Sequence, residues 1–243
     1  MKPKFNIGCS GFYNRHWKGI FYPDKLPQRR WFEFYAENFN TLELNTTFYR
    51  FPTAESLSAW YKKSPDSFLF CVKAPRLITH YKQFKDCARL IDDFYQACDS
   101  GLQDKLACTL FQMPPQFQYS EERLILLMES LNPGYKNVVE FRHESWWTKK
   151  VQAELAARNI VFCTVSHPKM PEKLVVNSPT VYVRLHGVPR MFYSDYSNEY
   201  LSTLYQSILK KKKVKEAFIF FNNTAGEAGI LNAQTMREVV KGT

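Results

Sequence analysis

The sequence lacks the paired ligands that mark structural metal sites and disulfide-bonded folds. None of its six cysteines forms a Cys-x-x-Cys pair, and no two of its five histidines have the spacing of a metal-binding helix. Four cysteines fall inside apolar, strand-like runs, where cysteine packs as a small hydrophobic residue: Cys9, Cys71, Cys108 and Cys163. We therefore expect unbridged thiols, no structural zinc, no other bound metal and no cofactor.

The sequence also lacks segments that target a chain to a membrane or anchor it there. A strand pattern begins within the first six residues, without a charged leader and apolar stretch, and no apolar run approaches the roughly 20 residues of a membrane span. We expect a cytoplasmic protein without a membrane partner. No linker, repeat or low-complexity tract divides the chain, so residues 1–243 are expected to form one domain.

Acidic residues are outnumbered: the chain has 33 Lys and Arg against 23 Asp and Glu, a formal net charge of +10. A surplus of this size favours anionic partners such as phosphates, nucleotides or nucleic acid, without choosing among them. The densest basic run, at residues 210–213, falls at the expected end of a helix. Cations there complement the helix dipole, which explains the run more simply than a nucleic-acid surface does.

Eight short apolar runs, rich in β-branched and aromatic residues, recur at regular spacing and predict strands. They span residues 5–11, 41–48, 68–74, 107–113, 137–143, 160–166, 180–187 and 216–223. Helical patterns separate most of them and follow the last, at residues 28–38, 55–63, 86–99, 120–130, 148–158, 197–211 and 229–240. After the sixth run, residues 168–173 show only a weak helical pattern.

The alternation predicts an α/β fold with parallel strands joined by right-handed crossovers. Eight such units close a (β/α)8 TIM-type barrel, which we expect as one domain. An open, doubly wound sheet is the alternative. The first strand and its loop, Gly8 to Tyr13, lack the glycine spacing that binds a dinucleotide in such sheets, and this favours the barrel.

Polar residues gather on one face of the expected strands, because side chains two apart along a strand share a face. In a barrel the outward face packs under helices, so this polar face is expected to point inward, near the carboxyl-terminal mouth where barrel enzymes hold their sites. Unpaired buried charge costs several kcal/mol. A solvated pocket therefore explains the set better than an inert salt-bridge network does, and we expect its members to converge on one cavity: Glu43, Lys73, Glu140, Arg142, Arg184, His186 and Asn222.

We predict that Glu140 or Glu43 acts as the acid or base and that His186 is a second candidate for proton transfer. A carboxylate near several cations stays ionised and accepts a proton, while the cations stabilise developing negative charge. A divalent ion shared by these three residues is less favoured, because neighbouring cations compete with it. The expected substrate-binding residues are the cations and amides of the mouth and the aromatic residues of its loops: Lys73, Arg142, Arg184, Gln112, Asn45, Asn222, Tyr49, Arg76, Trp17 and Trp146.

Several stretches carry a family resemblance, among them residues 8–11, 17–19, 21–23, 39–50, 112–115, 139–143, 184–187 and 221–223. With these stretches the chain closely resembles the YecE-like family, also called DUF72, over nearly its whole length. The resemblance implies a barrel and an enzyme-like protein of a family without a settled activity. Two departures stand out: Phe12 occupies an expected tryptophan position, and Ser166-His167-Pro168 replaces an acidic residue before proline.

We therefore expect a metal-independent enzyme that acts on a small anionic or polar substrate at the barrel mouth. The alternative is a nucleic-acid or nucleotide binding protein without turnover, whose affinity would fall steeply with salt. Glycoside hydrolysis by paired carboxylates is less favoured, because the cations would lower the raised pKa that its acid catalyst needs. A purely structural interaction protein would leave the polar mouth unexplained.

Overall fold

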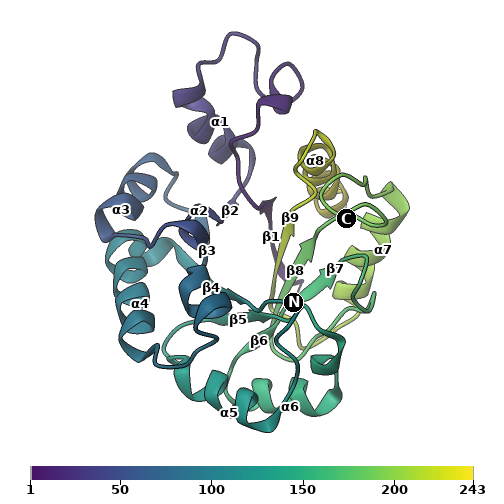
Figure 1. Cartoon of the computed structure of the whole chain (residues 1–243). Helices are drawn as coiled ribbons and strands as arrows, with labels where there is room; N and C mark the ends of the chain where they lie inside the picture. Colours follow the sequence, from purple (N-terminus) through teal and green to yellow (C-terminus); the bar gives the residue numbers. More distant parts are fainter. Residues whose placement is uncertain (1, 243) are drawn as a thin grey trace. The chain divides into compact units, whose positions relative to one another are not determined.

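The computed structural model describes residues 2–242 and divides into two compact units (Figure 1). Unit 1 is formed within Met1–Glu43 and Thr164–Thr243, and unit 2 is Leu44–Cys163. Each is built of helices and parallel strands, so the predicted α/β class with parallel pairing is confirmed. The described residues form two sheets, of four and five strands, rather than one closed sheet.

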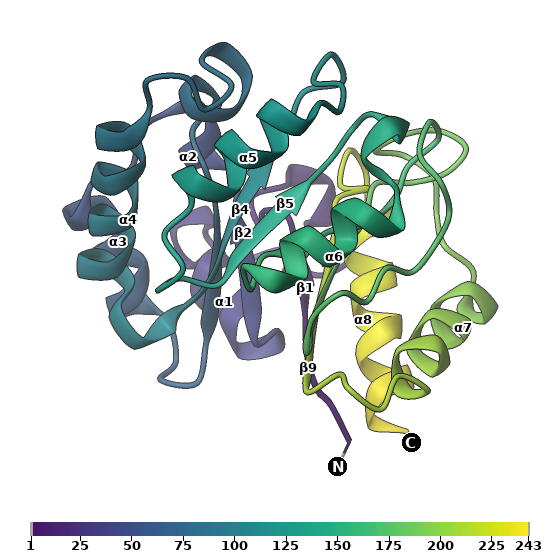
Figure 2. The ribbon, with the colours of Figure 1, turned by 90° about the horizontal axis from the view of Figure 1, so that it is seen from below.

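Unit 1 contains the four-stranded sheet, in the order β1-β9-β8-β7. These strands are β1 (Lys4–Cys9), β7 (Thr164–Ser166), β8 (Thr180–Leu185) and β9 (Glu216–Phe221). Helix α8 (Ala228–Lys241) packs against β1 and β9, and α7 (Asn198–Leu209) lies beside α8 (Figure 2). Two 3-10 turns, Arg15–Trp17 and Gln28–Arg30, precede α1 (Trp31–Asn38).

Unit 2 contains the five-stranded sheet, in the order β2-β3-β4-β5-β6. The strands are β2 (Thr41–Leu44), whose last residue opens the unit, β3 (Leu69–Lys73), β4 (Leu106–Gln112), β5 (Asn137–Glu140) and β6 (Val161–Phe162). The helices are α2 (Thr46–Tyr49), α3 (Ala54–Lys63), α4 (Ala88–Leu102), α5 (Glu121–Ser130) and α6 (Lys149–Ala157). Short turns of π-helix and 3-10 helix lie at Leu77–Tyr81, Gln103–Lys105 and Glu144–Trp146.

Local sequence sets where the helices begin. A Ser or Thr precedes four of them, and its side-chain oxygen accepts a hydrogen bond from a backbone N–H of the first turn: Thr53 for α3, Ser120 for α5, Thr148 for α6 and Ser197 for α7. Such a cap satisfies a donor that the helix itself leaves open. No helix within residues 2–242 is long and apolar enough to span a membrane.

All eight expected strands exist, but several boundaries were wrong. The second strand stops at Leu44, and residues 46–49, partly assigned to that strand, form α2. The Thr47 hydroxyl contacts the Leu44 carbonyl at 3.0 Å, which holds the chain in a helical turn. The sixth strand is interrupted at Cys163, so that β6 pairs with β5 while β7 pairs with β8. The weak helical pattern at 168–173 forms no helix.

The edge of β1 that faces away from β9 is bonded by side chains. The Cys9 N–H donates to the Tyr35 hydroxyl at 2.7 Å, and that hydroxyl donates to the Thr41 carbonyl at 3.1 Å. The Asn40 side chain accepts from the Ile7 N–H at 3.1 Å. A Cβ on Gly8 would lie 2.2 Å from the Thr41 carbonyl oxygen, so only glycine permits this approach. Side chains thereby satisfy a strand edge that would otherwise present open backbone groups.

Replacing Tyr35 by phenylalanine tests this edge. Tyr35→Phe removes one hydroxyl that serves two backbone groups and leaves the buried Cys9 N–H without its acceptor. We expect a loss of about 1–3 kcal/mol in the free energy of unfolding. Urea denaturation measures the loss, with Tyr193→Phe as control, since the Tyr193 side chain is exposed in the same unit. Equal midpoints for the two variants would contradict the structural role of the hydroxyl.

Candidate functional site

Three neighbouring parallel strands of unit 2 end in polar side chains: Lys73 on β3, Gln112 on β4 and Glu140 on β5. Gln112 and Glu140 are register partners, and Lys73 is the partner of Leu110, which lies two residues before Gln112. Register partners in parallel strands point to the same face, so the three side chains share one face of the sheet. All three are buried, with Glu140 fully so.

The Glu140 carboxylate is held by two neighbours in unit 2. The Arg142 Nε donates to its Oε1, and the Cys163 thiol lies 4.0 Å from its Oε2. The Arg142 side chain is only 11% exposed, so the ion pair lies largely out of solvent. A charge in this position persists only with a partner.

Lys73 is positioned by α2. Its ammonium lies 4.0 Å from the centre of the Phe48 ring, a cation–π contact, and the Thr47 hydroxyl lies 2.6 Å from its backbone carbonyl. The Phe48 ring also meets the His80 ring edge-on at 4.9 Å. One short helix therefore orders both the cation and the imidazole.

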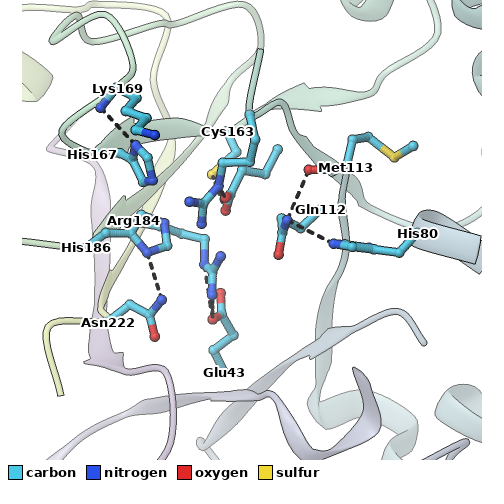
Figure 3. A network of polar contacts seen from close by, with 12 residues as sticks. Glu43, His80, Gln112, Met113, Cys163, His167, Lys169, Arg184, His186 and Asn222 are labelled. Atoms are coloured by element: carbon cyan, nitrogen blue, oxygen red, sulfur yellow. Dashed lines mark hydrogen bonds and ion pairs between the residues drawn. The ribbon is translucent and has the colours of Figure 1, made fainter. Parts of the chain in front are cut away.

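His80 lies near this cluster and points toward Gln112 (Figure 3). Its Nδ1 lies 2.9 Å from the Thr79 hydroxyl, and its Nε2 lies 3.5 Å from the Gln112 amide nitrogen, which is itself 3.0 Å from the Met113 carbonyl. Because the amide nitrogen can only donate, this geometry favours the neutral tautomer with the proton on Nδ1.

The charge of His80 is suppressed by its surroundings. Burial lowers its pKa from 6.5 to about 4, with help from the cations of Lys73, Arg142 and Arg76, while Glu140 acts in the opposite direction. His80 is therefore neutral at pH 7. An unfolded chain binds this proton near pH 6.5 and the folded chain only near pH 4, so the stability due to neutral His80 is present above pH 6.5 and is lost as the pH falls toward 4.

The backbone around His80 is unusual. His80 belongs to the π-helical turn Leu77–Tyr81, and three of the next five residues have left-handed backbone angles although none is glycine: Gln83, Phe84 and Asp86, with φ of 48°, 68° and 49°. Both π-helical turns and strained backbone gather at functional sites, where neighbouring contacts maintain them. Neighbouring contacts therefore maintain the backbone conformation that positions the His80 side chain.

Arg76, Tyr49 and Tyr81 form an exposed rim beside this cluster. Arg76 has its guanidinium 5.7 Å from the Tyr49 ring and 5.4 Å from the Tyr81 ring. The two tyrosines are 72% and 65% exposed, a large accessible area for aromatic side chains. The rim offers planar surfaces beside a cation.

Unit 1 contains a separate buried ion pair. Arg184 on β8 donates to Glu43 Oε1 through Nη2 at 2.6 Å and through Nε at 3.1 Å (Figure 3). The Tyr182 hydroxyl donates to Glu43 Oε2 at 2.7 Å. Both carboxylate oxygens are therefore engaged, and neither Glu43 nor Arg184 is more than 1% exposed.

Beyond the ends of β8 and β9, His186 and Asn222 form a second polar pair of unit 1 (Figure 3). The Asn222 amide nitrogen lies 2.7 Å from His186 Nδ1, and the His186 ring is fully buried. The amide can only donate here, so the neutral imidazole has its proton on Nε2. This pairing fixes the tautomer of the expected proton-transfer residue.

The structure thus groups the predicted residues within each unit. Unit 2 brings Lys73, Gln112, Glu140 and Arg142 together, and unit 1 pairs Glu43 with Arg184 and His186 with Asn222. Convergence of all seven predicted residues on one cavity stays a prediction, as does a single domain.

The expected aromatic walls divide into exposed and buried members. Trp17 and Trp146 are fully buried, and their indole N–H groups donate to the carbonyls of Gly226 and Phe117. Trp146 also stacks on Phe141. These contacts favour core packing for both tryptophans, so we leave them out of the proposed site. Asn45 occupies the N-cap position of α2, where its side chain makes no capping hydrogen bond.

Sequence reasoning gave no role to several residues that shape the clusters. Phe48 was assigned to a strand, Tyr182 alternates with apolar neighbours, and Cys163 resembles any small core residue. The signal that could have identified His80 is its place shortly after Lys73 and Arg76, in a stretch without strand or helix periodicity.

The described part of the chain contains no group of three or more His, Cys, Asp or Glu side chains arranged to hold a metal ion. All six cysteines are buried free thiols, and burial raises the pKa of the Cys9 and Cys98 thiols well above the usual value. These two thiols are unsuited to nucleophilic chemistry at neutral pH.

Comparisons with known proteins identify relatives over the whole chain. A family model described as "Protein of unknown function DUF72" matches residues 6–243. The UPF0759 protein YunF of Bacillus subtilis is 25% identical over 90% of this chain and 89% of its own, and the UPF0759 protein YecE of Escherichia coli K12 is 28% identical over 62% of this chain and 53% of its own.

Solved structures of the same family are similar to this one. A DUF72 family protein from Thermotoga maritima matches with a TM-score of 0.89 and 29% identity, over 98% of this chain and 99% of that one. A DUF72 family protein from Enterococcus faecalis matches with a TM-score of 0.82 and 21% identity, over 98% of both chains, which supports the fold alone.

Breaking the ion pair of unit 1 has a predictable cost. Glu43→Gln removes the carboxylate that balances Arg184, which is 1% exposed, and should destabilise the protein by about 3–5 kcal/mol. Glu121→Gln is the matched control, because its ion pair with Lys150 also measures 2.6 Å but is half exposed and screened by solvent, so its loss should change stability little. Chemical denaturation of both variants checks this, and equal losses would contradict the assignment.

The cations around His80 make a second prediction. Lys73→Met removes one cause of the lowered pKa, so the His80 pKa should rise above about 4 yet stay below 6.5, because burial persists. An NMR titration of the His80 ring measures it, with Lys63→Met, on the exposed end of α3, as control. A pKa that is the same in Lys73→Met as in the parent would exclude Lys73 from this cluster.

Proposed function

The chain belongs to the DUF72 family of proteins of unknown function, and we propose that it is an enzyme for a small anionic or polar substrate. Its site is proposed at the carboxyl ends of β3, β4 and β5, where Lys73, Gln112 and Glu140 share a face. The proposed chemistry uses side chains alone, without a metal ion or cofactor.

The observation that carries the proposal is the charge balance around His80. Burial and three cations, Lys73, Arg142 and Arg76, hold this imidazole neutral, while a single carboxylate, Glu140, acts against them. A partly buried cluster with surplus positive charge is stabilised by an anion, and it also stabilises negative charge that develops during a reaction. The strained backbone after the π-helical turn adds support from a second kind of observation.

Each residue has a proposed role. Glu140 is the general base, because it is the carboxylate of this cluster and Arg142 holds it in place. Lys73 and Arg142 bind the negative group of the substrate, and Gln112 orients it through its amide. Neutral His80 offers hydrogen bonds and gains basicity when a bound anion offsets the neighbouring cations.

The unit 1 residues have different proposed roles. Glu43 is held on both oxygens, which suits a structural ion pair better than proton transfer. His186 remains the second candidate for proton transfer, with its tautomer fixed by Asn222. We also propose the single eight-stranded barrel for the whole chain, supported by the strand orders β7-β8-β9-β1 and β2-β3-β4-β5-β6, which follow the chain in the sequence that a barrel requires.

Nucleic-acid or nucleotide binding without turnover is the second candidate. It is favoured by the net charge of +10 and by the exposed rim of Tyr49, Arg76 and Tyr81, where bases could stack. Binding dominated by phosphate contacts weakens steeply as salt rises. A salt series with a single-stranded oligonucleotide therefore separates this candidate from an enzyme with a buried site.

Glu140→Gln tests the enzyme proposal. The parent protein and the variant are incubated with a metabolite extract, and untargeted mass spectrometry follows which compounds are consumed. We expect the parent to convert an anionic or polar compound and the variant to lose at least about 100-fold in rate, the scale of a general base. The melting temperature should fall less than in Glu43→Gln, because glutamine keeps an acceptor for Arg142 and the Arg142 side chain is 11% exposed, against 1% for Arg184.

Two results would count against this assignment. A large fall in melting temperature of Glu140→Gln together with unchanged conversion would show a structural ion pair. Absence of conversion by the parent, combined with steep salt-dependent oligonucleotide binding, would favour the second candidate. Glu144→Gln serves as control, because this exposed residue lies four positions further along the chain and outside the cluster.

A further inference from the structure

A cavity lies between α2 and α3 in unit 2. Its volume is about 260 Å³, below the roughly 300–1,000 Å³ of sites that hold drug-sized ligands, so a smaller molecule fits it. The residues that give it chemical character are Thr46, Arg50, Phe51, Thr53, Ser56 and Trp60. None of them belongs to the cluster around Lys73 and Glu140.

The charged group that lines this cavity is a cation. Arg50 is the only charged residue that lines it, and within residues 2–242 its guanidinium makes no hydrogen bond or ion pair. The positive end of α3 adds to the same field, and the exposed Glu55 in its first turn opposes it partly. A planar guanidinium binds a carboxylate through two parallel hydrogen bonds.

The remaining walls combine rings and hydroxyl groups. Phe51 and Trp60 supply aromatic surface, and Leu57 and Pro52 supply apolar surface. The Thr53 oxygen accepts the Ser56 N–H in the helix cap, which leaves its hydroxyl hydrogen able to donate. A ligand that fits these walls has a flat apolar body and one anionic end.

We infer that this cavity binds a small aromatic carboxylate, with Arg50 on the carboxylate and the ring beside Trp60. The site is distinct from the proposed active site, because α2 stands between them: Thr47 lines the cavity, while the next residue, Phe48, contacts Lys73 and His80. The inference therefore does not depend on the proposed enzyme activity.

Titration with benzoate, followed by ¹H–¹⁵N NMR of the full chain, tests the inference. Shifts should concentrate in residues 46–60, and benzoate should bind more tightly than benzamide, which has the same ring without charge, or acetate, which has the charge without the ring. Arg50→Gln should weaken benzoate binding about tenfold or more. Arg89→Gln, an exposed arginine of the same unit, should leave it unchanged.

Trp60→Phe keeps an aromatic ring and should retain binding, whereas Trp60→Ala should weaken it. Benzamide binding as tight as benzoate, undiminished affinity in Arg50→Gln, or no benzoate binding at millimolar concentration would each overturn the inference. Shifts centred on Lys73 and His80 would place the anion in the proposed active site instead and would likewise overturn it.

Discussion

The structure depends on matching every charge that its strands carry into the interior. A buried carboxylate without a partner costs several kcal/mol, so its partner must come from a neighbouring segment in a fixed register. Glu43 is matched by Arg184 and Tyr182 in one unit, and Glu140 by Arg142 in the other. The two carboxylates differ in their surroundings. Hydrogen-bond donors occupy both oxygens of Glu43, whereas further cations lie around Glu140 and, together with burial, lower the pKa of His80.

Strand alternation predicted much of this. Apolar periodicity located a strand at each of the eight expected runs, although the sixth is divided into β6 and β7. The two-residue repeat placed Lys73, Gln112 and Glu140 on one face, as the register of β3, β4 and β5 has them. Alternation gives a face but no distance, so it could not decide which arginine pairs with which glutamate. It also failed at residues 46–48, where β-branched threonines suggested a strand although local hydrogen bonds form α2.

The aromatic residues show the limit of reasoning from residue type. Trp17 and Trp146 looked like ligand-facing walls because they follow strands and lie near cations in sequence, but both are buried and bonded to backbone carbonyls. By contrast, Phe48 does meet a cation, Lys73, although it lies within an apparent strand. Whether a side chain is buried depends on which distant segments pack over it, and the local sequence pattern does not reveal those segments. His80 lies in a loop without periodicity, so no sequence pattern showed that its ring would approach Gln112.

The π-helical turn that presents His80 contains one residue more per turn than an α-helix would, and this has a consequence for sequence variation. Removing Leu77 or Ile78 would restore ordinary winding and rotate the following side chains, His80 among them, by about 100°. His80 would then turn away from Gln112 even though every residue named in the cluster was still present. A homologue that keeps these side chains but has a shorter segment here would therefore lack the arrangement around His80. The length of this segment is then a better criterion than residue identity for deciding whether a homologue has the same proposed site.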